Sequence, residues 1–330
     1  MNYFVTGATG FIGKRLVAKL LARPEATVYF LTRAVEQSHL QDLYEYWGCE
    51  VRRAIPIVGD LTQAELGVSK ADIRKLKGKI EHFFHLAAIY DLKASAEDQQ
   101  RANVDGTRNT VRLAEEIGAG HFHLVSSIAS AGLFEGLFRE DMFDEAENLD
   151  NPYFRTKHDS EGIVRKECRI PWRIFRPAIV VGDSRTGEMD KIDGPYYFFK
   201  LIQKMRRMFP SWMPTIGIEG GRINVVPVDF VVAAMDHIAH LENEDGNCFH
   251  LTDPTPMRVG DLLNTFARAA HAPEMALRIN AALLGFIPRS MRKAMFALTP
   301  VRRIRSAVMK DLGLPDDILD FVNYPTRFDC

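Results

Sequence analysis

The sequence predicts an α/β protein, a doubly wound parallel (Rossmann) sheet followed by a smaller C-terminal lobe for the substrate. Short runs rich in Val, Ile and Phe alternate with amphipathic segments over the first half of the chain, a pattern typical of βαβ units. A glycine-rich turn, "TGATGFIG", follows the first of these runs. After Gly182 the alternation gives way to an aromatic-rich helical segment, so we place the domain boundary there.

The expected strands of residues 1–182 are apolar and are separated by helical segments such as 14–22 and 106–118. In chain order, these strands are 3–7, 27–33, 54–60, 82–88, 121–127 and 172–182. A further strand and a helix that starts at Asp229 return to this domain around residues 223–255. The rest of 183–330 forms the predicted substrate lobe, which ends in a basic segment.

Composition excludes several classes of protein. The 330 residues carry a formal net charge of −1 and a pI near 6.8, unlike a general nucleic-acid binder, whose domain is strongly basic. The four cysteines are far apart and form no CxxC pair, which indicates reduced thiols and a cytoplasmic protein. The first residues resemble a strand rather than a secretory signal, and no apolar run reaches the ~18 residues of a spanning helix.

The turn after the first strand predicts a nucleotide site. Gly7, Gly10 and Gly13 follow a GxxGxxG spacing between a strand and an amphipathic helix. Glycine lets the backbone approach a pyrophosphate, which then meets the helix N-terminus, where amide groups favour an anion. We therefore expect the loop residues to bind a dinucleotide, namely Gly7, Thr9, Gly10, Phe11, Ile12 and Gly13.

The end of the second expected strand favours NADPH over NADH. NAD enzymes usually place Asp or Glu here for the ribose 2′-hydroxyl, whereas this chain has Arg33, twenty residues after Gly13. Lys14 and Arg15 follow the glycine loop directly. A guanidinium suits a 2′-phosphate. The alternative is that Arg33 is a solvated strand end.

Two later strand ends complete the expected cofactor site. "GDLT" places Asp60, followed by Leu61, where a carboxylate can accept a hydrogen bond from the adenine amino group. "HLAA" follows the fourth expected strand, and small residues such as Ala87 let the backbone pass close to the ribose.

The stretch "NPYFRTKHD" carries the expected chemistry. Tyr153 and Lys157 share one face of a helix, and an ammonium beside a phenol lowers a phenolic pKa of about 10. Tyr153 then becomes a usable proton donor. Ser126 or Ser127, at the end of the fifth strand, could hydrogen-bond a substrate carbonyl oxygen. Asn103 either holds a water or is a polar helix residue without a catalytic role.

Two histidine pairs invite a metal hypothesis. His82 lies near His85, and His121 shares one strand face with His123. No third ligand is evident and both pairs fall in strands that need burial, so we expect no metal.

These motifs together resemble the extended branch of the short-chain dehydrogenase/reductase superfamily. The resemblance implies that Tyr153 is the general acid and that Lys157 binds the nicotinamide ribose and tunes Tyr153. It also implies that Ser127 polarises the substrate carbonyl, because Ser127 lies five residues before Gly132, as the family's serine lies before the matching glycine. Pro177 to Val180 would line the nicotinamide. The segments that carry the resemblance are "TGATGFIG", "GDL", "HLAA", "NVDGT", "SSIASAG", "YFRTK", "RPAIVVG", "INVVPVDFV" and "CFHLTDPTPM".

Three later stretches resemble the N-terminal half of bacterial fatty acyl-CoA reductases: "GEMDKIDGPYYFFKLIQKMRR", "TIGIEGGRINVVPVDFV" and "NYPTRFD". In that family the C-terminal half takes acyl-CoA to aldehyde and the N-terminal half takes aldehyde to alcohol. The resemblance implies NADPH-dependent reduction of a long-chain aldehyde, a lipid-like substrate. This chain is about half as long as such proteins, so a second reductase domain is the expected partner.

Other activities share the same fold. An acyl-thioester reductase and a hydroxysteroid dehydrogenase remain open. A nucleotide-sugar dehydratase is disfavoured because Ile128 and Ala129, not an acidic pair, follow Ser127. An epimerase normally holds NAD permanently, and Arg33 argues against NAD as the cofactor. A silent NADP-binding scaffold would not need the Ser127, Tyr153 and Lys157 set.

The segment 289–310 contains seven Lys and Arg residues, no acid, and interleaved Met, Phe, Leu, Val and Ile. Such a run is often a solvated face. It also resembles a basic amphipathic surface segment that docks on anionic lipid, CoA phosphates or an acidic partner domain. We expect peripheral membrane contact here, and no nucleic-acid partner.

Overall fold

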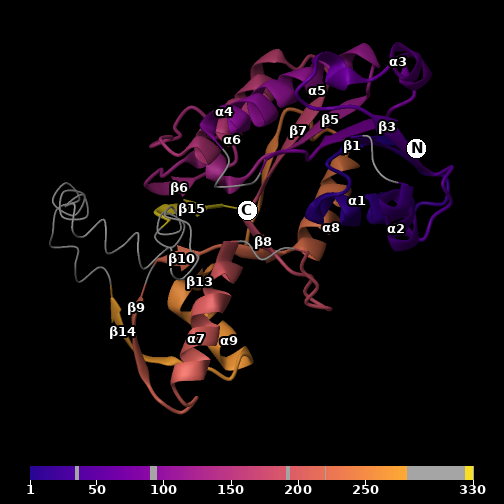
Figure 1. Cartoon of the computed structure of the whole chain (residues 1–330). Coiled ribbons are helices and arrows are strands. Elements are labelled where there is room, and N and C mark those ends of the chain that lie inside the picture. The colour runs from indigo at the N-terminus through magenta and orange to yellow at the C-terminus, as the bar shows by residue number, and fades with distance from the viewer. Residues whose placement is uncertain (34–36, 90–94, 191–193, 220, 281–323, 330) are drawn as a thin grey trace. The chain divides into compact units, whose positions relative to one another are not determined.

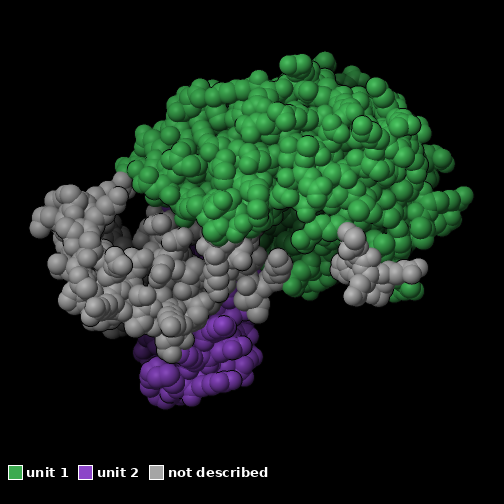
Figure 2. All heavy atoms as spheres, turned by 45° about the horizontal axis from the view of Figure 1, so that its top comes forward, with its two compact units in different colours: residues 1–190, 225–254, 326–330 green, residues 191–224, 255–325 purple. Residues whose placement is uncertain are grey.

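A computed structural model describes residues 1–33, 37–89, 95–190, 194–219, 221–280 and 324–329. The chain divides into two compact units, which Figure 2 shows in different colours. Unit 1 comprises residues 1–190, 225–254 and 326–330, and unit 2 comprises 191–224 and 255–325. Residues 326–330, which the sequence analysis placed in the C-terminal lobe, therefore belong to unit 1.

Unit 1 is built on a seven-stranded sheet in which every pair of neighbouring strands is parallel, so the predicted fold class is confirmed. The strand order is β12-β7-β5-β4-β1-β2-β3, and it reverses between β1 and β4, where doubly wound sheets bind their ligands. The strands are β1 (Asn2–Thr6), β2 (Thr27–Thr32), β3 (Ala54–Val58), β4 (His82–His85), β5 (His121–Val125), β7 (Trp172–Pro177) and β12 (Cys248–Leu251).

Helices cover both faces of this sheet (Figure 1). One face packs against α1 (Phe11–Leu21), α2 (Gln37–Trp47) and α8 (Val228–Ala239), and the other against α3 (Lys70–Leu76), α5 (Gly106–Glu116) and α6 (Pro152–Glu167). Successive strand residues point to opposite faces, so Tyr3 and Val5 join the α1 side and Phe4 joins the α5 side. Two apolar layers therefore bury the sheet, which fixes its strand ends.

Shorter elements complete unit 1. Helix α4 (Ala96–Gln99) runs into a π-helical turn (Gln100–Asp105) and then into α5. Strand β8 (Ile179–Val181) pairs in parallel with β11 (Val225–Pro227), and β6 (Gly136–Phe138) pairs in parallel with β15 (Thr326–Phe328).

The expected start of α8 needs a correction. The helix begins at Val228 after Pro227, and Asp229 lies inside its first turn. The Asp229 carboxylate accepts hydrogen bonds from the backbone N–H (2.9 Å) and the hydroxyl (2.7 Å) of Ser184. Asp229 therefore ties α8 to the loop after β8 and does not cap the helix.

In the described part of unit 2, α-helices and short strands pack around Ile202, Ala267 and Ala272. Strands β9 and β14 pair in parallel, and β10 pairs antiparallel with β13. The elements are a 3-10 helix (Gly194–Phe198), α7 (Phe199–Met208), β9 (Thr215–Glu219), β10 (Arg222–Ile223), β13 (Met257–Arg258), α9 (Val259–Ala269) and β14 (Met275–Asn280). The segment 289–310 lies outside the described residues. Among the helices described, none is long and apolar enough to cross a membrane.

Candidate active site

The glycine turn packs so closely that it excludes side chains. Gly7 has a φ of +74°, and a Cβ on it would lie 2.8 Å from the backbone nitrogen of Ala87. A Cβ on Gly13 would lie 2.0 Å from the carbonyl oxygen of Gly7. Gly10 precedes α1 without a side-chain cap, so no capping side chain satisfies the amides at this helix N-terminus. The turn therefore fits a dinucleotide pyrophosphate, with Thr9, Phe11 and Ile12 in the same turn.

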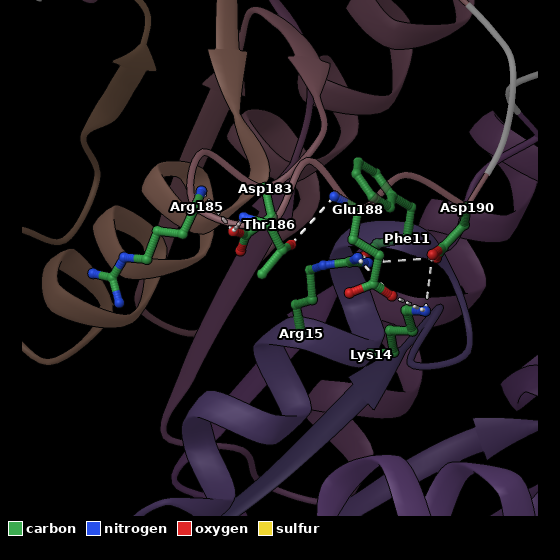
Figure 3. A network of polar contacts seen from close by, with 8 residues as sticks. All are labelled: Phe11, Lys14, Arg15, Asp183, Arg185, Thr186, Glu188 and Asp190. Carbon is green, nitrogen blue, oxygen red and sulfur yellow. Dashed lines mark hydrogen bonds and ion pairs between the residues drawn. The ribbon is translucent and has the colours of Figure 1, made fainter.

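Of the three cations expected near the adenosine ribose, two are already paired. Figure 3 shows Lys14 and Arg15 of α1 facing Glu188 and Asp190 in the loop after β8. The Lys14 ammonium lies 2.9 Å from an Asp190 carboxylate oxygen, and the Arg15 guanidinium lies 3.4 Å from both acids. Arg33, at the end of β2, is exposed. The structure thus leaves Arg33 as the accessible cation of this expected set.

Asp60 and Leu61 lie after β3, in a turn that their own contacts stabilise. The Asp60 carboxylate accepts hydrogen bonds from the Thr62 backbone (2.8 Å) and hydroxyl (2.7 Å), which lower the pKa of Asp60. The carbonyl oxygen of Leu61 accepts a hydrogen bond from the Asn109 side chain at 3.1 Å. One Asp60 oxygen is therefore occupied by the turn itself.

Helix α6 carries Tyr153 and Lys157 as the i, i+4 spacing predicts. The Asn151 side chain caps its first turn by accepting from the Tyr153 N–H at 2.9 Å, and Pro152 occupies the first helical position. Both Tyr153 and Lys157 are buried, at 7% and 9% exposure. The sequence therefore dictates locally the helical turn that holds both side chains.

Lys157 reaches the carboxyl end of β5. Its ammonium lies 3.5 Å from the Val125 carbonyl oxygen, and burial lowers the pKa of Lys157 to about 8. A small pocket surrounds this position, and its polar side chains come from β4, the residue after β5, α5, α6 and the π-helical turn. The pocket residues are His85, Ala87, Ala88, Asn103, Thr107, Leu124, Val125, Ser126, Lys157 and Ser160.

The two neighbouring serines have different partners. The Ser126 hydroxyl lies 3.1 Å from a Glu161 carboxylate oxygen and donates to it. The Ser127 oxygen accepts from the Ala129 N–H at 3.2 Å and starts a 3-10 turn over 128–131. Its hydroxyl hydrogen is not used by that bond. Ser126 lines the pocket but gives its hydrogen to Glu161, whereas Ser127 keeps its hydrogen for another acceptor.

Asn103 does not present a free amide. Its oxygen accepts from the Ile89 N–H at 2.7 Å, and its nitrogen donates to the Ile89 carbonyl (3.2 Å) and the Thr156 hydroxyl (3.3 Å). These contacts hold the segment after β4 against α6. The side-chain amide of Asn103 is thus already hydrogen-bonded to Ile89 and Thr156 through the groups that would otherwise hold a water.

Pro177 ends β7, and Val180 lies in β8, directly after the sheet edge that carries the site. His85 is a site residue that the sequence reasoning missed. It is fully buried, and its ring nitrogens lie 2.7 Å from the Thr6 hydroxyl and 3.1 Å from the Thr107 hydroxyl. Burial lowers the pKa of His85 to about 3, so the ring is neutral. A polar histidine at the end of an apolar strand could have indicated a site residue. The sequence analysis considered His85 only as a metal ligand.

Among the described residues, no group of three or more His, Cys, Asp and Glu side chains could hold a metal ion. His82 and His123 bond to each other, with 3.0 Å between ring nitrogens. His82, His85 and His123 thus lie in the packed interior of the sheet, and His121 is half-buried at its edge.

A dinucleotide-binding turn, a doubly wound sheet and a Tyr-x-x-x-Lys helix define an extended short-chain dehydrogenase/reductase, and hence an oxidoreductase that uses a nicotinamide cofactor. The family model described as "Male sterility protein" matches residues 5–235, and the chain belongs to that NAD-binding family.

Curated relatives agree with this class. A linear gramicidin synthase protein from Brevibacillus parabrevis is 30% identical over 274 residues, which cover 78% of this chain and 5% of that protein. An aldehyde reductase from Aspergillus flavus is 27% identical, over 99% of this chain and 33% of its own length. A Drosophila melanogaster protein, whose name describes a candidate fatty acyl-CoA reductase, is 26% identical over 87% of this chain and 69% of its own. This chain thus spans a small part of the large synthetases it matches.

The fold is also found in solved structures. The terminal R domain from the myxalamid PKS-NRPS biosynthetic pathway matches with a TM-score of 0.72 and 24% identity, covering 97% of this chain and 78% of that one. A UDP-glucuronic acid 4-epimerase from Bacillus cereus, solved with NAD, matches with a TM-score of 0.62 and 20% identity over 85% of this chain and 87% of that one. At such identity the likeness concerns the fold alone.

Proposed function

We propose that the chain is an NADPH-dependent reductase that takes a long-chain aldehyde to the alcohol. One observation carries this proposal. Helix α6 holds Tyr153 and Lys157 one turn apart and buried, with Lys157 at the carboxyl end of β5, in the same unit as the glycine turn. That edge of the sheet is where this fold binds its reactants.

The nicotinamide group, when bound, supplies the hydride for the carbonyl carbon. Tyr153 donates the proton to the carbonyl oxygen, which completes the alcohol, and Ser127 donates a hydrogen bond to that oxygen as charge develops. Lys157, with a pKa of about 8, carries its ammonium at neutral pH and stabilises the phenolate that Tyr153 becomes. Its buried position keeps that charge from being screened by water.

Preference for NADPH rests on Arg33. It is exposed at the end of β2, where NAD enzymes carry an acid. Lys14 and Arg15 are neutralised by Glu188 and Asp190, so the 2′-phosphate would depend on Arg33.

The long-chain aldehyde is supported by relatives named as aldehyde reductases and by the aromatic-rich start of unit 2. The test is NADPH oxidation against aldehydes of increasing chain length, acyl-CoAs, ketosteroids and UDP-sugars. We expect turnover with aldehydes, rising with chain length. Turnover confined to ketosteroids or UDP-sugars would contradict the proposal.

A second candidate is reduction of an acyl thioester. Its support is that similar proteins include a linear gramicidin synthase, of which this chain matches 5%. The stoichiometry separates the two candidates. An aldehyde consumes one NADPH for each alcohol formed, whereas a thioester reduced to the alcohol consumes two.

The basic segment 289–310 is proposed as a docking site for an anionic membrane or for the acidic face of a second reductase domain. Charge reversal at Arg302, Arg303 and Arg305 should raise KM for long-chain substrates at low salt and spare short aldehydes, because salt screens such attraction. Vesicle co-sedimentation checks the membrane contact. Identical kinetics for both substrate classes, without vesicle binding, would leave a solvated face.

A further inference from the structure

A buried charged cluster lies beside the candidate active site, and the proposed chemistry does not use it. Arg176 of β7 and Glu161 of α6 are both 0% exposed. A guanidinium and a carboxylate lose their hydration when buried, and their attraction repays this cost only with well-placed hydrogen bonds. The pair therefore needs an explanation beyond stability.

The cluster reaches the candidate catalytic residues through Glu161. Its carboxylate accepts a bidentate pair of bonds from Arg176 and a bond from the Ser126 hydroxyl. The backbone N–H of Ser126 is held by the Phe175 carbonyl oxygen at 2.8 Å. Burial favours the neutral acid, yet Arg176 and Arg165 lower the pKa of Glu161, so it stays ionised. Glu161 thus fixes the residue before Ser127.

Glu161 also lies on the helix that carries the proton donor. It follows Lys157 by one helical turn on α6, and Tyr153 lies one turn before Lys157. Because Arg176 holds Glu161 from the neighbouring strand β7, the pair fixes α6 against the sheet at this point.

In the other direction the cluster reaches the end of the described chain. Arg176 lies 3.2 Å from the Nε2 atom of His250, and the Nδ1 atom of His250 lies 3.0 Å from an Asp329 carboxylate oxygen. The same Nδ1 atom lies 3.1 Å from the Asp329 carbonyl oxygen. Arginine only donates and these oxygens only accept, so His250 is the neutral tautomer that accepts from Arg176 and donates to Asp329. Burial and Arg176 lower the pKa of His250 to about 4, which agrees with this tautomer.

The segment that carries Asp329 is docked by a second, independent set of contacts. Strand β15 pairs with β6, from Thr326 opposite Gly136 to Phe328 opposite Phe138. The Thr326 hydroxyl donates to the Phe134 carbonyl oxygen at 2.6 Å. Phe328 packs against the small apolar cluster Ala131, Phe138 and Met142. Ala131 ends the 3-10 turn that Ser127 starts, so this apolar route also leads to the candidate site.

We propose that Glu161, Arg176, His250 and Asp329 are positioning residues, through which strand β15 and the Asp329 that follows it hold the Ser127 turn and α6 in their reactive arrangement. The inference rests on the proposed function, because it assigns a role in that site. Residues more than 190 positions apart in the sequence would then form one support, which joins Asp329 to Ser126.

The first test replaces His250 with Phe. This variant keeps an aromatic ring between Phe138 and Phe328 but removes the contacts of the histidine ring nitrogens with Arg176 and Asp329. We expect kcat to fall roughly 10- to 100-fold, because a small displacement of reacting groups has effects of this size. NADPH affinity should stay unchanged, since the glycine turn lies on β1 and α1. Asp329→Asn, which retains an oxygen acceptor for His250, should keep most of the activity.

Two further variants separate positioning from folding. Deletion of residues 326–330 removes β15 and Asp329 without altering a buried charge, and we expect the same loss of kcat. Asp141→Asn, in the exposed Arg139–Asp141 pair beside β6, is the matched control and should behave as wild type. Rates are normalised to the fraction of chain that binds NADPH. The inference is overturned if the loss of kcat disappears after this normalisation. It is also overturned if His250→Phe and the deletion variant both keep wild-type kcat.

Amide hydrogen exchange supplies a readout without substrate. In the deletion variant, amides of 127–138 and of the α6 segment 153–161 should exchange faster, while those of β1 and α1 should not change. If the wild-type chain reduces no substrate of the panel, the proposed function fails, and exchange still decides the support role. Unchanged exchange at 127–138 overturns the inference even where activity is present.

Discussion

The two ends of the seven-stranded sheet both bury titratable side chains, but they use them differently. At the amino-terminal end, His82 bonds to His123 with 3.0 Å between ring nitrogens, and their rings stack with centroids 5.2 Å apart. Tyr3 bonds to His240 at 2.9 Å, and burial raises the pKa of Tyr3 to about 12. These groups mainly contact one another inside the core beneath α8.

At the carboxyl end, the buried groups surround a pocket. Lys157 lies 3.5 Å from its backbone acceptor, His85 is hydrogen-bonded by threonines on both sides, and the glycine turn leaves the α1 N-terminus without a side-chain cap. The difference shows that burial of a histidine or tyrosine does not by itself mark a site. A site needs polar groups directed at a space, and this sheet provides it at the edge where its strands end.

The sharpest test of this comparison exchanges a tyrosine at each end. Tyr153→Phe should lower kcat about 100- to 10,000-fold, the usual contribution of a general acid, while NADPH binding persists. Tyr3→Phe, the control at the amino end, loses its bond to His240 but should keep wild-type kcat. Steady-state kinetics and cofactor fluorescence titration measure both. Wild-type turnover by the Tyr153 variant would remove that residue from the chemistry.

Two glycines compare the ends by steric fit. Gly13→Ala would place a Cβ 2.0 Å from the Gly7 carbonyl oxygen, so the turn must shift. Overpacking costs about 1–3 kcal/mol, or roughly 5- to 150-fold in cofactor affinity. Gly78→Ala, before β4, has a φ of +68° and nothing within 4 Å of its Cβ. It should cost about 1–2 kcal/mol of stability without weakening the cofactor. Equal cofactor affinity in both variants would argue against the glycine turn as the binding site.

Charge at the carboxyl end should set the choice of cofactor. Arg33→Asp should weaken NADPH roughly 10- to 100-fold and change NADH little, because a charge-assisted contact contributes about 1.5–3 kcal/mol. Lys14→Gln is the matched control, since Lys14 is already paired with Asp190. That control should shift both cofactors equally. Should Arg33→Asp also weaken both alike, Arg33 does not contact the 2′-phosphate.

Acid should destabilise the chain through its buried histidines at both ends of the sheet, and His82 tests the amino end. Burial lowers the pKa of His82 from 6.5 to about 3, so the unfolded chain takes up that proton first. Stability is therefore full above pH 6.5 and falls toward pH 3, by up to about 1.4 kcal/mol per pH unit for each such histidine. His82→Phe should flatten this slope by about one proton and leave kcat at neutral pH unchanged. Urea unfolding between pH 7.5 and 4.5 measures the slope, and an unaltered slope would contradict the assignment.

Local patterns were enough to predict the class of fold and the local backbone geometry at parts of the candidate site. The alternation of apolar strands and amphipathic helices indicated the parallel sheet, because each period buries one face of an element. Gly7 and Gly13 were recognisable because their backbone geometry excludes a side chain. Tyr153 and Lys157 could be placed on one face from the pitch of a single helix. Asn151 and Pro152 mark the start of that helix. In each case the residues that form the pattern lie close together in the sequence.

Contacts between distant residues were decided by the tertiary structure alone. Lys14 and Asp190 are 176 positions apart, and the sequence of neither segment indicates that the two side chains form an ion pair. The spacing to Gly132 singled out Ser127 through the family resemblance, but that the neighbouring Ser126 donates to Glu161 could not be read from the sequence. Strand β15, placed by sequence in the C-terminal lobe, pairs with β6 of unit 1 and brings Asp329 to His250. Polar groups find such partners only when the chain is packed, because the charge and shape that select them come from residues on other elements.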